Sequence, residues 1–172
     1  VSSELTPRDI GGHWRVRWGI GRDDYRVEPG IYSLGQPDEK SPVLVSANYK
    51  LSFDTLRRSL PGRHAWILVL DTDGINVWCA AGKGTFGTDE LVRRIALTGL
   101  AALVSHRTLI VPQLGAVGVA AREVKKCSGF KVVFGPVRAG DLPAFLDEGL
   151  KATPSMRRIF FTFRGRLILV PM

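Results

Sequence analysis

The residues best suited to chemistry in this sequence lie in one segment, Asn76-Val77-Trp78-Cys79-Ala80-Ala81-Gly82-Lys83. Asparagine is a good N-cap and glycine commonly ends a helix, so we expect a short helix that starts after Asn76 and ends at Gly82. Cys79 then lies in the first turn, where the positive end of the helix dipole favours a thiolate. The alternative is a structural cysteine, because free cysteine is among the most buried residue types.

Other motifs with chemical potential are weaker. Residues 82–87 match the pattern GxGxxG, but no strand ends directly before them and no acidic residue lies about 20 positions later. The histidines form no metal-ligand pair, although a catalytic pair of Cys79 and His106 stays open because such partners are adjacent only in space. Cys79 and Cys127 are too few for a disulfide framework or an iron–sulfur cluster held by this chain alone, and they suggest a reducing compartment.

The composition is that of an ordinary folded domain. The chain has 172 residues, of which 45% are apolar, so a sizeable core is expected. A net charge of +8 suits nucleic acid, anionic lipid, an acidic partner or simply a solvated surface. No zinc-finger spacing, RNA-binding aromatic pattern or basic helix is present, so no nucleic-acid partner is expected. No apolar run approaches the roughly 20 residues that span a bilayer, and no signal peptide begins the chain.

The elements that must position Cys79 alternate between strands and helices. Apolar runs predict strands at residues 43–45, 66–70, 109–111 and 131–134. Apolar periodicity predicts helices at 52–60, from Thr88 to about residue 104, at 117–126 and at 142–150. The fold class is therefore α/β: a Rossmann-like open sheet with helices on both faces, a short cap helix at the cofactor edge, and a C-terminal β-hairpin at 158–170.

Two regions are expected along the chain. Residues 1–40 are rich in Gly, Pro, Arg and Asp and predict a wrapping arm, in which residues 14–18 alternate like a short strand. Residues 41–172 form the α/β domain. Because the chain starts at Val1 and stops at Met172, we expect it to be a fragment of a longer protein.

Four loops rich in Gly, Pro and polar residues follow the predicted strands, at residues 46–50, 71–87, 112–118 and 135–139. In an open α/β sheet such loops share the carboxyl edge, where ligands bind. Repeated glycine lets the backbone approach a large flat ligand closely. Turn chemistry explains any one of these loops, but four at one edge favour a cofactor site.

The segment 76–83 resembles the cap-helix motif of the mercury-methylation corrinoid proteins (the HgcA family), which are related to the corrinoid iron–sulfur proteins. The similarity extends over nearly the whole chain, through residues 17–21, 47–50, 84–88, 109–116 and 135–139. It implies methyl transfer from base-off cobalamin to Hg(II), producing methylmercury, with Cys79 as the lower axial ligand of cobalt. Two alternatives stay open: a corrinoid methyl carrier of one-carbon metabolism, and a basic binding module in which Cys79 is merely buried.

The resemblance also implies which residues contact the cobalamin. Asn76 orients the cap helix, Trp78 braces it, and Lys50 and Arg138 are candidates for the phosphate or amides of the cofactor. The full implied set is Asn48, Tyr49, Lys50, Thr72, Asn76, Val77, Trp78, Cys79, Ala80, Lys83, Gly84, Thr85, Phe86, Gln113, Leu114, Gly115, Ala116, Gly118, Pro136, Val137, Arg138 and Ala139.

Partners and location follow from the same resemblance. It implies a ferredoxin-like iron–sulfur partner (HgcB) that returns cobalt to Co(I), a methyl-donor protein, and Hg(II) as the substrate. Members of the resembled family continue into a transmembrane region, so we expect a membrane-anchored protein at the cytoplasmic face of the inner membrane. Arg157, Arg158, Arg164 and Arg166 would then follow the positive-inside rule. Cys127 is interpreted as structural.

Overall fold

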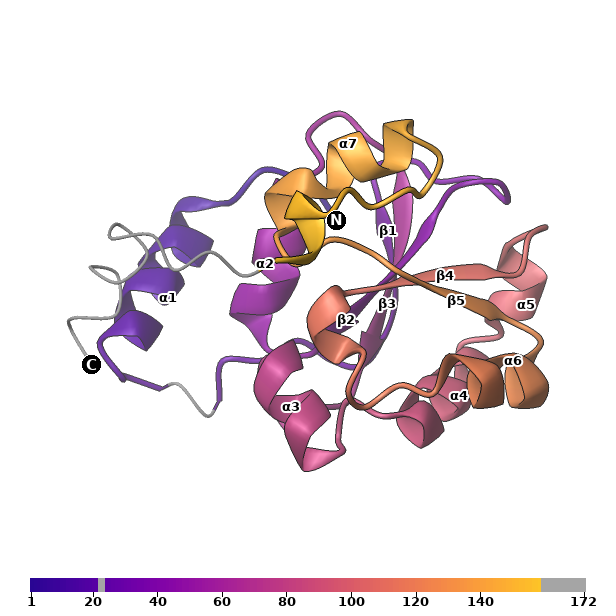
Figure 1. Cartoon of the computed structure of the whole chain (residues 1–172). Helices are drawn as coiled ribbons and strands as arrows, with labels where there is room; N and C mark the ends of the chain where they lie inside the picture. The colour runs from indigo at the N-terminus through magenta and orange to yellow at the C-terminus, as the bar shows by residue number, and fades with distance from the viewer. Residues whose placement is uncertain (22–23, 159–172) are drawn as a thin grey trace.

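A mixed β-sheet forms the centre of the molecule. The computed structural model describes residues 1–21 and 24–158, and in this part of the chain the sheet has five strands in the order β1-β3-β2-β4-β5 (Figure 1). Strands β2, β3, β4 and β5 are parallel, whereas β1 pairs antiparallel with β3. Their bounds are β1 Gly30–Leu34, β2 Val43–Ala47, β3 Ala65–Leu70, β4 Thr108–Val111 and β5 Lys131–Phe134. The predicted open α/β sheet is confirmed.

Apolar runs in the sequence become strands that are covered on both faces. In β3, every residue except Trp66 is buried, and Ile67 pairs with Leu44 of β2. Leu44 pairs in turn with Ile110 of β4, so the middle of the sheet is a continuous apolar layer. A strand buried on both faces reads as an unbroken apolar run, which is why these strands could be predicted.

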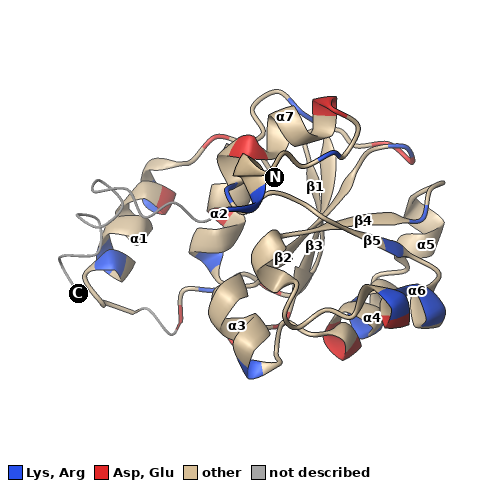
Figure 2. Ribbon diagram, in the orientation of Figure 1, with Lys and Arg blue, Asp and Glu red and all other residues tan. Residues whose placement is uncertain are grey.

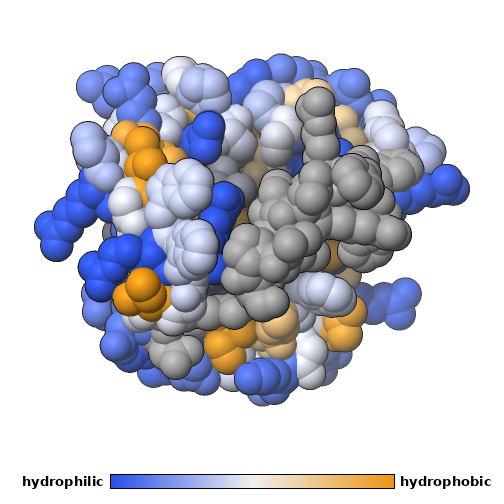
Figure 3. Space-filling model, turned by 90° about the vertical axis from the view of Figure 1, so that its left-hand side faces the viewer, coloured by the Kyte–Doolittle hydropathy of each residue, from blue (hydrophilic) through white to orange (hydrophobic). Residues whose placement is uncertain are grey.

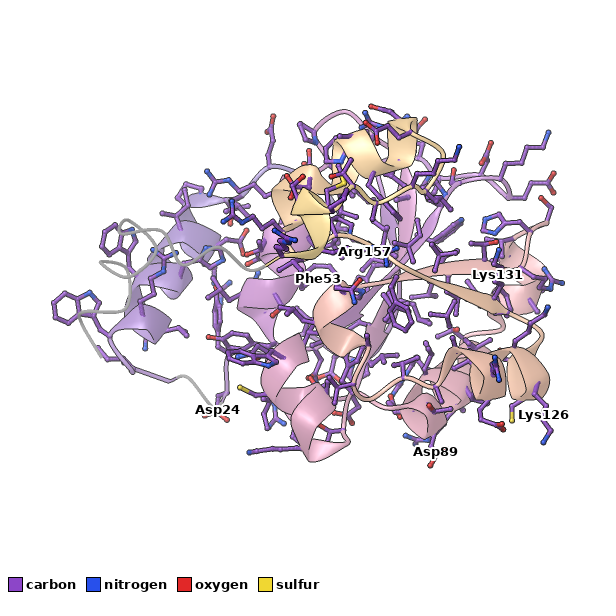
Figure 4. The ribbon with its side chains drawn as sticks, in the orientation of Figure 1. Asp24, Phe53, Asp89, Lys126, Lys131 and Arg157 are labelled. Atoms are coloured by element: carbon purple, nitrogen blue, oxygen red, sulfur yellow. The ribbon has the colours of Figure 1, made fainter. Side chains whose placement is uncertain are left out.

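Helices cover both faces of the sheet, as expected. One face packs against α3 Val77–Lys83, α4 Thr88–Leu97, α5 Leu100–Leu103 and α6 Ala121–Ser128. The other packs against α2 Lys50–Arg58 and α7 Leu142–Asp147, and Phe53 of α2 points into this second core (Figure 4). Asp89 of α4 and Lys126 of α6 point outwards. Short 3-10 helices occupy η1 Gln113–Gly115, η2 Ala139–Asp141 and η3 Ser155–Arg157.

Several boundaries differ from prediction for local reasons. The predicted helix from Thr88 to residue 104 divides into α4 and α5, because Gly99 adopts a left-handed conformation with φ 61°. The predicted helix at 117–126 starts only at Ala121. Helix α7 ends at Asp147 and is followed by Gly149 with φ 67°. Apart from Arg158, the predicted hairpin lies outside the described residues.

The N-terminal region is more ordered than an extended arm. Residues 14–18, predicted as a strand, lie in or directly after helix α1 Pro7–Arg17, so that prediction is wrong. Thr6 and Asp9 form a capping box and Pro7 occupies the first turn, a start signal that outweighs the short alternation. Strand β1 adds residues 30–34 to the sheet. The domain boundary at residue 40 stays a prediction.

The surface is basic but not concentrated in one patch. Lys and Arg are spread over α1, α2, α3, α4 and α6 (Figure 2). On the side that carries α1, hydrophobic side chains lie among hydrophilic ones (Figure 3). Within the described ranges, no helix has the length and apolarity needed to cross a membrane.

Candidate functional site

The carboxyl ends of the four parallel strands meet at one edge, which contains a cavity of about 450 Å³. The cavity lies between α2, the start of α3, and the loops that follow β4 and β5. Its walls are largely apolar: Leu44 and Ile110 come from the strands, and Leu114 and Val137 from the loops. All four of the glycine- and proline-rich loops predicted to share this edge contribute to the cavity wall, through Ser46 and Tyr49, residues 76–78, Pro112 and Leu114, and residues 135–137 with Ala139.

Helix α3 begins as predicted and ends later than predicted. Asn76 is its N-cap, and the Asn76 Oδ1 accepts a hydrogen bond from the Cys79 backbone N–H at 3.0 Å. The helix passes through Gly82 and ends at Gly84, whose φ of 86° is the left-handed conformation that terminates helices. Ala80 and Ala81 are buried against the sheet, so the opposite side of α3 faces outwards.

Cys79 is exposed on that outer side, next to Trp78, whose exposed fraction is 63%. The alternative of a buried structural cysteine is therefore wrong. The alternative pair with His106 is also wrong, because the His106 ring contacts the Ser41 carbonyl and the Thr108 N–H before β4, at the opposite edge of the sheet. Cys127, interpreted as structural, is exposed on α6.

Eight of the predicted contact residues line the cavity: Tyr49, Asn76, Val77, Trp78, Leu114, Pro136, Val137 and Ala139. The other predicted residues do not line it: Asn48, Lys50, Thr72, Cys79, Ala80, Lys83, Gly84, Thr85, Phe86, Gln113, Gly115, Ala116, Gly118 and Arg138. Two packing roles explain some of these. Phe86 is fully buried in the core, and a Cβ at Gly118 would collide with the Phe86 carbonyl oxygen, so glycine is required where this loop meets α3.

Lys50, predicted to serve the phosphate or amides of the cofactor, has other partners. Its Nζ lies 2.7 Å from Asp9 Oδ1 and 2.8 Å from Asp54 Oδ2. Burial works to lower the pKa of Lys50, but hydrogen bonds to Asp54 and Asp9 outweigh burial and raise the pKa above its ordinary value. Lys50 therefore joins α2 to α1 and does not reach into the cavity.

Sequence reasoning missed a large part of the cavity wall. The missed residues are Leu44, Val45, Leu51, Ser52, Thr55, Leu56, Ile110 and Leu142, while Ser46, Pro112 and Gly135 lie in the predicted loops but were not among the predicted contacts. Most belong to strands or to α2, where the search had concentrated on loops. One signal was available: Leu51, Ser52 and Thr55 are spaced to share one face of a helix that follows β2.

The cavity suits an apolar ligand group, with one buried polar atom beside it. A cavity of about 450 Å³ with apolar walls is of the size that holds small ligands. Gln113 Oε1, in the loop beside it, is a buried acceptor with no hydrogen-bond partner among the residues that the structure describes, and such atoms are costly unless something satisfies them. Among the described residues, no cluster of His, Cys, Asp and Glu has the makings of a metal site.

Comparison with known proteins gives consistent matches. A family model described as CO dehydrogenase/acetyl-CoA synthase delta subunit matches residues 20–146. The gamma subunit of the acetyl-CoA decarbonylase/synthase complex of Methanopyrus kandleri is 35% identical over 132 residues, which cover 75% of this chain and 28% of the relative. Gamma subunit 2 of Methanosarcina thermophila is 34% identical over 134 residues, covering 74% and 28%. The chain thus spans about 28% of the length of these relatives.

These matches correct two expectations drawn from the cap-helix resemblance. The relatives are named as subunits of the acetyl-CoA decarbonylase/synthase complex, so the prediction of methyl transfer to Hg(II) is wrong, and these names give no support to HgcB as a partner. The predicted location at the cytoplasmic face of the inner membrane depended on the same resemblance, and it is wrong for the same reason. The resemblance extended over nearly the whole chain, but the activity that it implied depended on the cap-helix motif, and the relatives that match three quarters of the chain do not support that activity.

Proposed function

Because the chain belongs to the CO dehydrogenase/acetyl-CoA synthase delta subunit family, we propose that it is a corrinoid-binding domain that carries methyl groups in one-carbon metabolism. Family membership implies a corrinoid cofactor. The observation that supports the carrier role most directly is local: the apolar cavity and the exposed Cys79 lie at the same sheet edge, on either side of the start of α3.

The cavity supports binding in the base-off form, in which the nucleotide base of the cofactor is kept away from cobalt. Its apolar walls, with Tyr49 and Trp78 among them, suit a flat heterocyclic base. Gln113 and the backbone of the loops after β4 and β5 would hold the amide side chains of the corrin. When bound, the corrinoid supplies a cobalt centre that accepts and donates a methyl group.

Cys79 is proposed as the lower axial ligand of that cobalt. A thiolate is a soft, electron-donating ligand. The Cys79 side chain is exposed at the first turn of α3 and is not packed in the core. The Asn76 cap and the buried Ala80 and Ala81 hold the helix that presents it. The chain's contribution is thus to orient the ligand and to shelter one side of the cofactor.

Protein partners are part of the proposal, since a carrier needs a donor and an acceptor of the methyl group. The relatives are named as subunits of a multi-subunit complex. We propose that this domain likewise exchanges methyl groups with other proteins.

The visible absorption spectrum with hydroxocobalamin tests the proposal. The wild-type chain is expected to retain the corrinoid on gel filtration, with an absorption that differs from that of free base-off corrinoid. Cys79→Ala is expected to retain the corrinoid through the cavity but to lose that difference. Cys127→Ala is the matched control, because Cys127 is the other exposed cysteine and lies on α6, outside the cavity lining.

The outcomes separate the two parts of the proposal. A wild-type chain that binds no corrinoid would contradict the carrier function. Retention of corrinoid with identical spectra for wild type and Cys79→Ala would leave the carrier function standing and remove Cys79 as the axial ligand.

A further inference from the structure

The loop between β3 and α3 has an unusual backbone. Asp73 and Gly74 both adopt left-handed conformations, with φ of 55° and 72°. Aspartate tolerates this conformation better than most residues with a side chain, and Asp-Gly is a sequence that favours such turns, so residues 73 and 74 form a tight turn after β3. Thr72 and Gly74 are nevertheless buried, which places several polar backbone groups away from water.

One side chain satisfies these groups. Asn48 follows β2 directly and has an exposed fraction of 1%. Its Oδ1 lies 3.1 Å from the Thr72 backbone N, 2.8 Å from Thr72 Oγ1 and 2.9 Å from the Gly74 backbone N. Its Nδ2 donates to Asp71 Oδ1 at 3.3 Å. All four polar contacts of the side chain therefore go to residues 71–74.

The contacts continue towards Cys79. The Thr72 hydroxyl oxygen lies 2.7 Å from the Ile75 carbonyl oxygen and 2.8 Å from Asn48 Oδ1. Because the hydroxyl has one proton, it donates to one of these two acceptors at a time. The Ile75 N–H donates back to the Thr72 carbonyl at 3.0 Å and closes the turn. The next residue, Asn76, caps α3 through the Cys79 N–H.

We infer that Asn48 is a positioning residue: it holds the loop 71–76 in one conformation and thereby sets the place of α3 and Cys79. Its importance for chemistry depends on the proposed role of Cys79, but the positioning itself does not. Asn48 does not line the cavity, so it acts through the loop rather than by contact with the cofactor. If α3 already has its bound position before the cofactor binds, less conformational entropy is lost when Cys79 meets the cofactor.

The amide of asparagine is the suitable group for this role. It combines an acceptor for the backbone N–H groups with a donor for the Asp71 carboxylate. Aspartate at position 48 would keep the acceptor but would place a second carboxylate beside Asp71. Alanine would leave the N–H groups of Thr72 and Gly74 without their acceptor.

The first test uses the protein without cofactor and measures amide hydrogen exchange in α3 Val77–Lys83. Asn48→Ala is expected to exchange roughly tenfold faster or more, because the variant loses several net hydrogen bonds. The control is Leu34→Ala, which leaves a cavity in the core on the other sheet face and lowers global stability without touching the loop. Exchange in α3 is compared between variants under conditions where both are fully folded.

A charge-exchange pair gives the conservative rescue. Asn48→Asp alone is expected to speed exchange in α3, because it sets two carboxylates side by side. The double variant Asn48→Asp/Asp71→Asn restores one donor and one acceptor with their positions exchanged, and it is expected to return exchange in α3 towards the wild-type rate. Equal exchange in Asn48→Ala and Leu34→Ala would overturn the inference, as would failure of the double variant to improve on Asn48→Asp.

The second readout is spectroscopic and is made with hydroxocobalamin. The Cys79-dependent part of the absorption is expected to fall in Asn48→Ala and Asn48→Asp and to return in the double variant, while Leu34→Ala keeps it. A Cys79-dependent absorption unchanged in Asn48→Ala would also overturn the inference. If the wild-type chain itself shows no such absorption, the proposed axial ligation fails, and hydrogen exchange still decides the positioning role.

Discussion

At the start of α3, the Asn76 side chain provides a hydrogen-bond acceptor for a backbone N–H group that has no acceptor within the helix. The first N–H groups of any helix lack internal acceptors, and Asn76 Oδ1 accepts from the Cys79 N–H at 3.0 Å. Because the donor belongs to Cys79 itself, the cap restrains the backbone of the residue that is proposed to carry the chemistry.

Asn76→Ala is therefore expected to lower the free energy of unfolding by about 1 kcal/mol, the usual cost of losing an N-cap. Urea denaturation measures this change. Asn76→Asp keeps the acceptor and should stay close to wild type. Equal losses in the two variants would show that the cap contributes little.

At the scale of the element, α3 contains one glycine and is ended by another, and the two are in opposite situations. Gly82 lies inside the helix, whereas Gly84 ends it with φ 86°. A Cβ would meet no heavy atom within 4 Å at either position, so backbone conformation alone distinguishes them. Alanine substitutions at the two positions therefore compare the effect of backbone conformation alone on the end of α3.

Gly84→Ala is expected to destabilise the protein by about 1–2 kcal/mol, because a side chain disfavours the left-handed conformation. Gly82→Ala is expected to stabilise it by roughly 0.5–1 kcal/mol, since alanine loses less backbone entropy in a helix. Urea denaturation of both variants checks the sign. A gain in stability for Gly84→Ala would mean that α3 ends elsewhere in solution.

At the scale of the whole molecule, ion pairs join helix α1 to α2. Val16 is the only buried residue of α1, but Asp9 contacts both Lys50 at 2.7 Å and Arg57 at 2.8 Å on α2. Asp54 of α2 contacts the same two cations. The other side of α2 lines the cavity, so this cluster connects the N-terminal helix to the wall of the proposed cofactor site.

The cluster predicts a dependence of stability on pH. Partial burial works to raise the pKa of Asp9, but hydrogen bonds from Lys50, Thr6 and Arg57 outweigh it and hold the pKa well below the ordinary 3.8. A lowered pKa in the folded state stabilises the protein above that ordinary value, and this contribution is lost as pH falls from about 4 towards the folded pKa.

Asp9→Asn should lower the free energy of unfolding by about 3 kcal/mol at pH 7, because it leaves two largely buried cations short of a partner. The loss should shrink at pH 3. Urea denaturation at the two pH values measures it. Asp147→Asn is the control: its pair with Arg63 is more exposed, so its effect should be small. An equal loss at both pH values for Asp9→Asn would contradict the role of ionised Asp9.

The sequence alone determined the features that depend on near neighbours. Short continuous apolar runs predicted β2, β3, β4 and β5, because strands buried on both faces need them. Asn76 predicted the start of α3, because capping involves residues three positions apart. The capping box of α1 was equally local, but the short alternation around Trp14 obscured it.

Tertiary structure decided what depends on distant partners. Whether Cys79 is buried or exposed depends on which side of α3 packs on the sheet, and the sequence of a seven-residue helix leaves that open. The resemblance implied that Lys50 serves the cofactor, but the fold brings Asp9, which lies 41 residues away in the sequence, against its ammonium group. The resemblance also implied that Asn48 contacts the cofactor, whereas the folded chain brings the end of β2 against the loop after β3 and gives Asn48 its partners there. The role of each of these side chains depends on which residues contact it, and residues distant in the sequence come into contact only when the chain folds.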